Sequence, residues 1–219
     1  KLMQALIETG KPLVVVYIQG RTLKMNLAAE KANALLTAWY PGGEGGHAIA
    51  DVLFGDYNPA GRLPVSIARN EGQLPIYYSK GDQRAYMDGN ANALYSFGYG
   101  LSYTKFEYSD LQIKPGNGKD VLQTVTCTVK NAGDRDGQEI VQLYIRDMVA
   151  SIAQAPILLK AFERVELKKG ESKTVTFNLG KQELSIYNAA LEEVVEPGDF
   201  KVMVGAASND IRLEGMFKL

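Results

Sequence analysis

The sequence contains very little of two residue types on which common functional sites depend. Among 219 residues there is one cysteine, Cys127, and one histidine, His47. A single cysteine cannot form a disulfide within the chain, and a histidine without neighbouring cysteines or a second histidine gives no metal-ligand pattern. We therefore expect no metal ion and no cofactor. Cys127 lies in an alternating apolar pattern, and we interpret it as a small core residue.

An excess of one charge and long apolar runs are also missing. Lysine and arginine number 24 against 25 aspartate and glutamate residues, which gives a formal net charge of −1. This balance offers no electrostatic attraction to nucleic acid or to an anionic membrane. The apolar run over 12–18 is far shorter than the roughly 20 residues that span a bilayer. We therefore expect neither nucleic acid nor a membrane as a partner.

The first part of the chain alternates helical and strand patterns. Residues 1–9 have helical spacing, and residues 11–18 form a near-continuous apolar run that is typical of a strand buried in a parallel sheet. A short helix follows at 26–33, where we expect Asn26 to act as the cap, and a second strand covers 34–39. This order of helices and buried strands predicts an α/β domain.

A glycine-rich corner follows at 42–64. Its glycines precede an apolar helix over 47–54, Gly55 is placed to end that helix, and a strand is expected over 62–67. We interpret Arg62 as the partner of a nearby carboxylate. Four further polar residues of the corner are interpreted as structural residues of the loop, helix and turn: Glu44, His47, Asp51 and Asp56.

This first part is too small to complete a parallel sheet. Residues 1–70 supply two or three strands, whereas such a sheet needs several neighbouring strands and helices over both faces. We therefore expect the chain to be the C-terminal part of a longer polypeptide whose earlier strands complete the sheet. A rearranged minimal domain and a partner chain that supplies the remaining strands are the alternatives.

From residue 106 the apolar period changes to two. Val125, Cys127 and Val129 alternate with threonines, and turn signals separate about seven segments of this kind. These segments cover 106–113, 121–130, 139–147, 158–167, 173–179, 200–205 and 211–217. Seven short strands in roughly 115 residues predict an immunoglobulin-like β-sandwich. The fold class is therefore a partial α/β sandwich followed by an all-β sandwich.

Several long motifs in this order resemble glycoside hydrolase family 3. They are GEGG at 43–46, IADVLFGDYNPAGRLP at 49–64, QLPIYY at 73–78, ALYSFGYGLSY at 93–103, LKAFERVELKKGESKTVTFNL at 159–179 and VVEPGDFKVMVGAAS at 194–208. The resemblance implies three regions. Residues 1–78 are the C-terminal part of an α/β-sandwich domain, 79–103 a connecting loop, and 104–219 a fibronectin type III-like domain.

The resemblance also implies a function. Members of the family look like retaining enzymes with an aspartate nucleophile in an N-terminal barrel. In the β-glucosidase branch a glutamate acid/base comes from an upstream part of the α/β-sandwich domain. Neither motif is in this chain, so no catalytic residue is assigned here. We expect the C-terminal region of an exo-acting, periplasmic or extracellular β-glucosidase that hydrolyses terminal β-D-glucosidic bonds of oligosaccharides or aryl glucosides. The chain alone should be inactive.

Other functions remain open from the sequence. Within the same family they are β-xylosidase and α-L-arabinofuranosidase activity. The chain could also be a non-catalytic module that stabilises the enzyme, mediates homodimerisation or binds carbohydrate. Arg84, Tyr86 and Asp88 are the candidate substrate-binding residues, because Arg and Asp bond to hydroxyls while a tyrosine ring offers an apolar face to a sugar. Interdomain packing is the alternative role for their loop.

Overall fold

The computed structural model describes residues 1–80 and 90–219. These residues form two compact units. The first contains 1–57, 67–76 and 90–95, and the second contains 58–66, 77–80 and 96–219. The segments on either side of 67–76 therefore group with the second unit rather than with the first. The three-region division of the whole protein at residues 78 and 103 stays a prediction.

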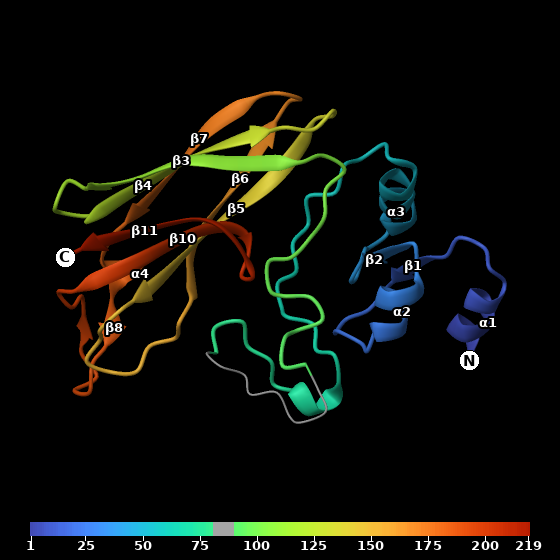
Figure 1. Ribbon diagram of the computed structural model, residues 1–219, viewed down its shortest axis with the longest axis horizontal. Coiled ribbons are helices and arrows are strands. Elements are labelled where there is room, and N and C mark those ends of the chain that lie inside the picture. The colour runs from blue at the N-terminus through green and yellow to red at the C-terminus, as the bar shows by residue number, and fades with distance from the viewer. Residues whose placement is uncertain (81–89) are drawn as a thin grey trace. The chain divides into compact units, whose positions relative to one another are not determined.

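The first unit contains the predicted alternation of helices and parallel strands (Figure 1). Strand β1 (Val14–Tyr17) pairs in parallel with β2 (Ala34–Thr37), with Val14 opposite Ala34. The other elements are α1 (Leu2–Glu8), α2 (Asn26–Lys31), α3 (Gly45–Phe54) and the 3₁₀ turn η1 (Glu71–Gln73). Helix α2 connects the two strands, as parallel pairing requires.

The two predicted helix ends in this unit have different outcomes. Gly55 ends α3 with φ 87°, the left-handed conformation that glycine adopts without steric cost. The predicted cap of α2 is wrong, because Met25 holds the cap position and Asn26 is the first helical residue, without a side-chain capping bond. The predicted strand over 62–67 is also wrong: only Ile67 makes a bridge, to Tyr95.

Apolar side chains of this unit are largely open to solvent. Val14 is 49% exposed, and Phe54 at the end of α3 is 85% exposed. Of the large apolar side chains in the described part of this unit, only Met25 and Ile67 are buried. Two short strands and their helices therefore do not bury enough apolar side chains to form a core. This agrees with the expectation that the α/β region is too small to complete a parallel sheet.

The second unit is the predicted β-sandwich, and all seven predicted strands are present (Figure 1). One sheet has the order β11-β10-β5-β6 and the other β3-β4-β7, with antiparallel neighbours in both. The strands are β3 (Phe106–Pro115), β4 (Gln123–Asn131), β5 (Gly137–Asp147), β6 (Leu158–Leu167), β7 (Ser172–Leu179), β10 (Asp199–Ala207) and β11 (Asp210–Lys218). Three short elements were not predicted: α4 (Lys181–Leu184), β8 (Ile186–Tyr187) and β9 (Glu193–Val194).

The sandwich core comes from the period-two pattern. In β4 the apolar residues are buried and the intervening threonines are half-exposed. Val141, Leu143 and Ile145 of β5 enter the same core, and the rings of Phe200 and Phe217 stack with centroids 5.2 Å apart. Each fully buried side chain of this size contributes about 1.5–3 kcal/mol, so this alternation accounts for most of the driving force of the unit.

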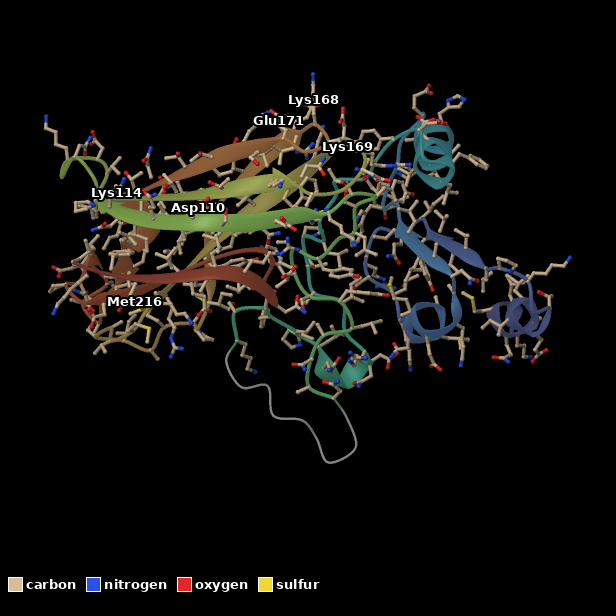
Figure 2. All side chains as sticks on the ribbon, turned by 45° about the horizontal axis from the view of Figure 1, so that its top comes forward. Asp110, Lys114, Lys168, Lys169, Glu171 and Met216 are labelled. Atoms are coloured by element: carbon tan, nitrogen blue, oxygen red, sulfur yellow. The ribbon has the colours of Figure 1, made fainter. Side chains whose placement is uncertain are left out.

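The turn between β6 and β7 connects the two sheets of the sandwich and is rich in charged residues. Lys168, Lys169 and Glu171 lie there (Figure 2), and the Lys168 backbone N–H donates to Glu171 Oε2 at 2.7 Å. This bond is the main reason that the pKa of Glu171 is lowered. Gly170 has φ 77°, which the other residues of the turn adopt only with strain.

Cys127 is expected to resist a soluble disulfide reagent such as dithionitrobenzoate in the folded chain. It is 1% exposed, and burial raises the pKa of its thiol to about 11. At pH 8 about one thiol in a thousand is then a thiolate, the reactive form. The guanidinium-unfolded chain is the control and should release one equivalent of colour. Rapid release from the folded chain would contradict the core position.

Candidate functional site

The predicted loop and turn residues of the glycine-rich corner lie on the surface of the first unit. His47 Nδ1 is 2.8 Å from Glu44 Oε2, and both side chains are 88% exposed. Glu44 precedes α3 without making a side-chain capping bond. Asp51 and Asp56 are exposed as well, and the Asp51 carbonyl accepts the Tyr57 N–H at 3.0 Å. These contacts lie at the surface around α3 and its turn, and the structural role of the four residues stays a prediction.

The candidate substrate-binding residues Arg84, Tyr86 and Asp88 lie outside the described residues. Their assignment stays a prediction. Among the residues that the structure does describe, no group of three or more His, Cys, Asp and Glu side chains could hold a metal ion. No helix within 1–80 and 90–219 is long and apolar enough to cross a membrane.

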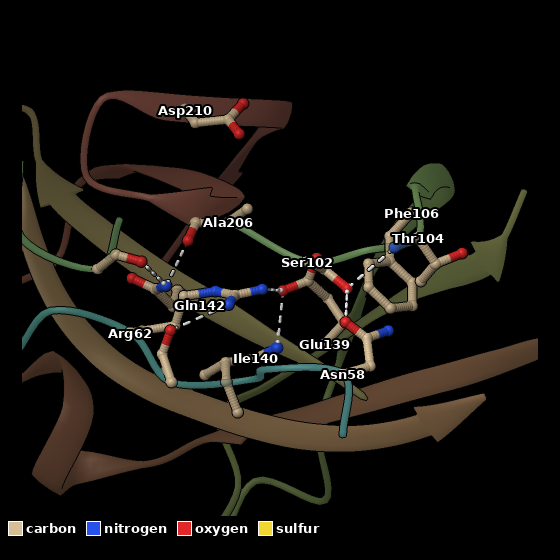
Figure 3. A network of polar contacts seen from close by, with 12 residues as sticks. Asn58, Arg62, Ser102, Thr104, Phe106, Glu139, Ile140, Gln142, Ala206 and Asp210 are labelled. Atoms are coloured by element: carbon tan, nitrogen blue, oxygen red, sulfur yellow. Dashed lines mark hydrogen bonds and ion pairs between the residues drawn. The ribbon is translucent and has the colours of Figure 1, made fainter. Parts of the chain in front are cut away.

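The most extensive polar arrangement lies inside the second unit (Figure 3), and an ion pair is at its centre. Arg62 Nη2 is 2.8 Å from Glu139 Oε1, and the two side chains are 8% and 3% exposed. Glu139 Oε1 also accepts the Ile140 N–H at 2.7 Å, while Arg62 Nη1 donates to the Gly61 carbonyl at 3.1 Å. The expected carboxylate partner of Arg62 is thus a strand residue of the sandwich.

Asn58, in the same segment 58–66 as Arg62, makes a second set of hydrogen bonds to the sandwich. Its Nδ2 donates to the Asp136 carbonyl at 2.9 Å. Its Oδ1 accepts both the Ser102 hydroxyl at 2.9 Å and the Tyr103 N–H at 2.8 Å. One side chain therefore joins segment 58–66, the approach to β3 and the turn before β5.

Gln142 fastens the segment around Gly98. Its Nε2 donates to the carbonyls of Ala206 at 2.6 Å and Gly98 at 3.2 Å, and its Oε1 accepts the Tyr144 hydroxyl. Gly98 has φ 83°, and a Cβ there would lie 2.2 Å from Gln142 Oε1. Glycine is therefore required by both the backbone angle and the close approach.

Aromatic contacts complete the cover of β5. The rings of Tyr78 and Phe97 stack at 4.3 Å between centroids, and Tyr78 meets Tyr144 edge-on at 6.1 Å. The Tyr78 hydroxyl accepts the Leu159 N–H at 3.2 Å. Because its other face is in the core, the middle of β5, 141–145, is buried on both sides. Segments 58–66, 77–78 and 96–105 are thus integral parts of the second unit.

The buried network supports anchoring rather than acid–base chemistry. Burial, with the nearby Glu139 carboxylate, raises the pKa of Tyr108 well above its ordinary value, so this hydroxyl stays protonated. Within the described chain, the Tyr108 hydroxyl and Arg62 Nε are buried without a hydrogen-bond partner. The Arg212 guanidinium lies 4.8 Å from the Tyr108 ring centroid.

Comparison with known families assigns both parts of the chain. Residues 1–103 match the family described as "Glycosyl hydrolase family 3 C-terminal domain". The chain carries the C-terminal domain of glycosyl hydrolase family 3. Residues 139–208 of this family 3 chain match the family described as "Fibronectin type III-like domain". The two matches confirm the order of domains that the motifs predict.

Curated relatives match nearly the whole of the family 3 chain. The "Periplasmic beta-glucosidase" of Salmonella typhimurium is 42% identical and matches 100% of the chain, which spans 30% of that protein. The "Beta-xylosidase" of Formosa agariphila is also 42% identical and matches 95% of the chain, again with 30% of that protein covered. The chain therefore spans about a third or less of the length of these relatives.

Solved structures have the same fold. A β-glucosidase from Erythrobacter marinus has a TM-score of 0.93 and 44% identity, covering 100% of the family 3 chain and 29% of the solved chain. A β-glucosidase from Listeria innocua in complex with glucose has a TM-score of 0.91 and 38% identity, covering 99% and 32%. These similarities confirm the partial α/β region followed by an all-β sandwich.

Of the anchoring residues of the family 3 chain, the sequence predicts an ion pair only for Arg62 and does not identify Glu139, Asn58 or Gln142, although Glu139 carries one signal. Glu139 has the same strand parity as Val141, Leu143 and Ile145, so it is a charged residue on the inward face of a strand. A charge at such a position is rarely buried without a partner. The identity of that partner, Arg62, could not be read locally because 77 positions separate the two residues.

Proposed function

We propose that the chain is the C-terminal region of a retaining, exo-acting glycoside hydrolase that releases terminal β-D-glucose. The observation that carries this proposal is the match of the full chain to proteins named β-glucosidases, at 42% identity for the Salmonella relative. The glucose-bound Listeria structure supports glucose as the sugar. Substrates would be oligosaccharides or aryl β-glucosides bound mainly by segments outside this chain.

The contribution of this chain would be structural. The side chains of Asn58, Arg62, Glu139 and Gln142 bond within the second unit, and Glu44, His47, Asp51 and Asp56 would stabilise the glycine-rich corner. The nucleophile and the acid/base would lie in other parts of a protein of which this chain spans about 30%, the share of the Salmonella relative that it covers. A stabilising role without its own catalysis follows.

The test compares the whole protein with the 219-residue chain on p-nitrophenyl β-D-glucopyranoside. The whole protein should release nitrophenol, whereas the chain alone should match a mock preparation. Hydrolysis by the chain well above the mock rate would contradict the structural role.

β-Xylosidase activity is the second candidate, because the Formosa relative is equally similar at 42% identity. Glucose differs from xylose by one hydroxymethyl group, and a pocket that contacts this group prefers its substrate on the order of tenfold or more. The ratio of kcat/KM for the β-glucoside and the β-xyloside therefore separates the two activities. An α-L-arabinofuranoside in the same series tests for α-L-arabinofuranosidase activity.

A periplasmic or extracellular location is part of the proposal. Its support is the Salmonella relative, which is named a periplasmic β-glucosidase. Release of the activity by osmotic shock, or its presence in the medium, is the expected result. Activity that stays with a cytoplasmic marker enzyme would contradict this location.

A further inference from the structure

A pocket of about 340 Å³ opens in the first unit where its two parallel strands end. Residues 18–21 follow directly after β1, and Tyr40 lies three residues after β2. In open α/β sheets, ligands bind in the crevice outside the carboxyl ends of the strands. The lining residues are Ile18, Gln19, Gly20, Arg21, Leu23 and Tyr40. The volume is at the lower end of the range of small-molecule sites, about 300–1,000 Å³, which suits a single ring.

A backbone hydrogen bond joins the two segments beside this pocket. The Gln19 N–H donates to the Trp39 carbonyl at 3.1 Å, which ties the segment after β1 to the segment after β2. Trp39 has φ 52°, a left-handed conformation that is strained for a bulky residue. Such strain persists where the surroundings enforce it, and it occurs preferentially at ligand and active sites.

The side chains at the pocket offer one group of each kind that a sugar needs. Tyr40 is 83% exposed and presents a ring. Its hydroxyl lies 1.8 Å from where a Cβ on Gly20 would stand, so the ring rests against that glycine. Arg21 is exposed, and its guanidinium donates hydrogen bonds but accepts none. Aromatic face and guanidinium thus flank the same opening.

Gln19 adds an acceptor that lacks its bond. The residue is 5% exposed, and its Nε2 donates to Thr37 Oγ1 at 2.9 Å. Its Oε1 is buried without a hydrogen-bond partner within the described residues. A buried acceptor is normally paired with a donor, and a group bound in the pocket could supply one. A hydroxyl donates and also accepts, so it can serve both Gln19 and Arg21, whereas an anion would face an uncompensated amide oxygen.

From these four observations we infer that the pocket at the ends of β1 and β2 binds one pyranose ring, stacked on Tyr40 and hydrogen-bonded to Arg21 and Gln19. The choice of a β-glucoside as probe rests on the proposed function. The experiment measures sugar binding and not hydrolysis. A lack of binding would therefore not contradict the proposed hydrolase activity, and binding would not establish that activity.

The experiment titrates the 219-residue chain with methyl β-D-glucopyranoside and with cellobiose. Trp39 is the only tryptophan and precedes the lining residue Tyr40, so its fluorescence reports on the surroundings of this pocket. Saturable fluorescence change and slowed amide exchange over 18–23 are the expected result. Tyr40→Ala and Arg21→Ala should each weaken binding about tenfold or more, the effect of losing an aromatic contact or a charged donor.

Two controls keep the test decisive. Tyr187→Ala removes a comparably exposed tyrosine, 63% exposed, from the β-sandwich and should leave sugar binding unchanged. Sodium sulfate probes Arg21 as an anion site. A fluorescence response to sulfate but not to sugar, no response to sugar up to its solubility, or equal loss of binding in Tyr187→Ala and Tyr40→Ala would each overturn the inference. Circular dichroism verifies that each variant is folded.

Discussion

Glu139→Ala is expected to lower the free energy of unfolding of the second unit by about 3–5 kcal/mol, the usual cost of removing one partner of a buried ion pair. Arg62 would keep its charge at a position where 8% of its side chain is exposed. The Ile140 N–H would lose its acceptor as well. Urea unfolding followed by far-ultraviolet circular dichroism measures the change, with the slope m checked for constancy.

A double variant distinguishes the pair from its separate members. Arg62→Met combined with Glu139→Leu removes both charges, and replacing a buried pair with apolar residues is often neutral or stabilising. We therefore expect the double variant to recover most of the stability lost in Glu139→Ala. The matched control is Glu214→Ala, which breaks the more exposed pair with Lys201 at 2.8 Å. Such pairs contribute about 0–1 kcal/mol. Equal losses in Glu139→Ala and Glu214→Ala would contradict the anchoring role.

Asn131→Ala should cost about 2–6 kcal/mol, because it leaves two buried groups unpaired at about 1–3 kcal/mol each. Asn131 is 0% exposed at the end of β4. Its Oδ1 accepts the Thr104 hydroxyl at 2.6 Å, and its Nδ2 donates to the Leu167 carbonyl at 3.1 Å and the Arg135 carbonyl at 2.8 Å. One amide thus connects the entry to β3, the turn before β5 and the end of β6.

Thermal and urea unfolding of Asn131→Ala measure this loss. Asn178→Ala is the control, because Asn178 is an exposed strand asparagine whose bond with Thr124 at 3.2 Å faces solvent. Surface substitutions of this kind change stability within about 0.5 kcal/mol. If Asn131→Ala is no worse than Asn178→Ala, water replaces the lost bonds and the site is less dry than its exposure indicates.

The sandwich was predictable because one physical rule governs it. A strand with one buried face alternates apolar and polar residues, and β4 does so from Thr124 to Lys130. The two-residue strands β8 and β9 were not predictable, since a period needs more than two positions to be recognised. Segment 62–67 fails for another reason: Leu63 bonds through its backbone to Tyr99 and Gly98, which are loop residues. The segment has the sequence pattern of a strand, but no strand lies beside it to complete a ladder of hydrogen bonds.

The site was predictable only in part, for reasons of distance along the chain. Inward-facing charge marks Glu139, but nothing near it in the sequence indicates Arg62, Asn58 or Ser102. The pocket at the ends of β1 and β2 depends on Tyr40 lying against Gly20, twenty positions earlier. Glycine in a loop is ordinary in a sequence, and only the placement of the ring shows why a side chain is excluded there.

The burial of Arg62 has a consequence for how the protein is made. Ribosomal synthesis delivers Arg62 long before Glu139, because 77 positions separate them. Until β5 has emerged, the guanidinium and the amide of Asn58 can only be hydrated. Closing so long a loop costs chain entropy, and this cost is offset only when the strands supply the hydrogen-bond acceptors. Segment 58–66 therefore docks late, and nascent chains that stop short of β5 should be cut by proteases there, whereas finished chains should resist.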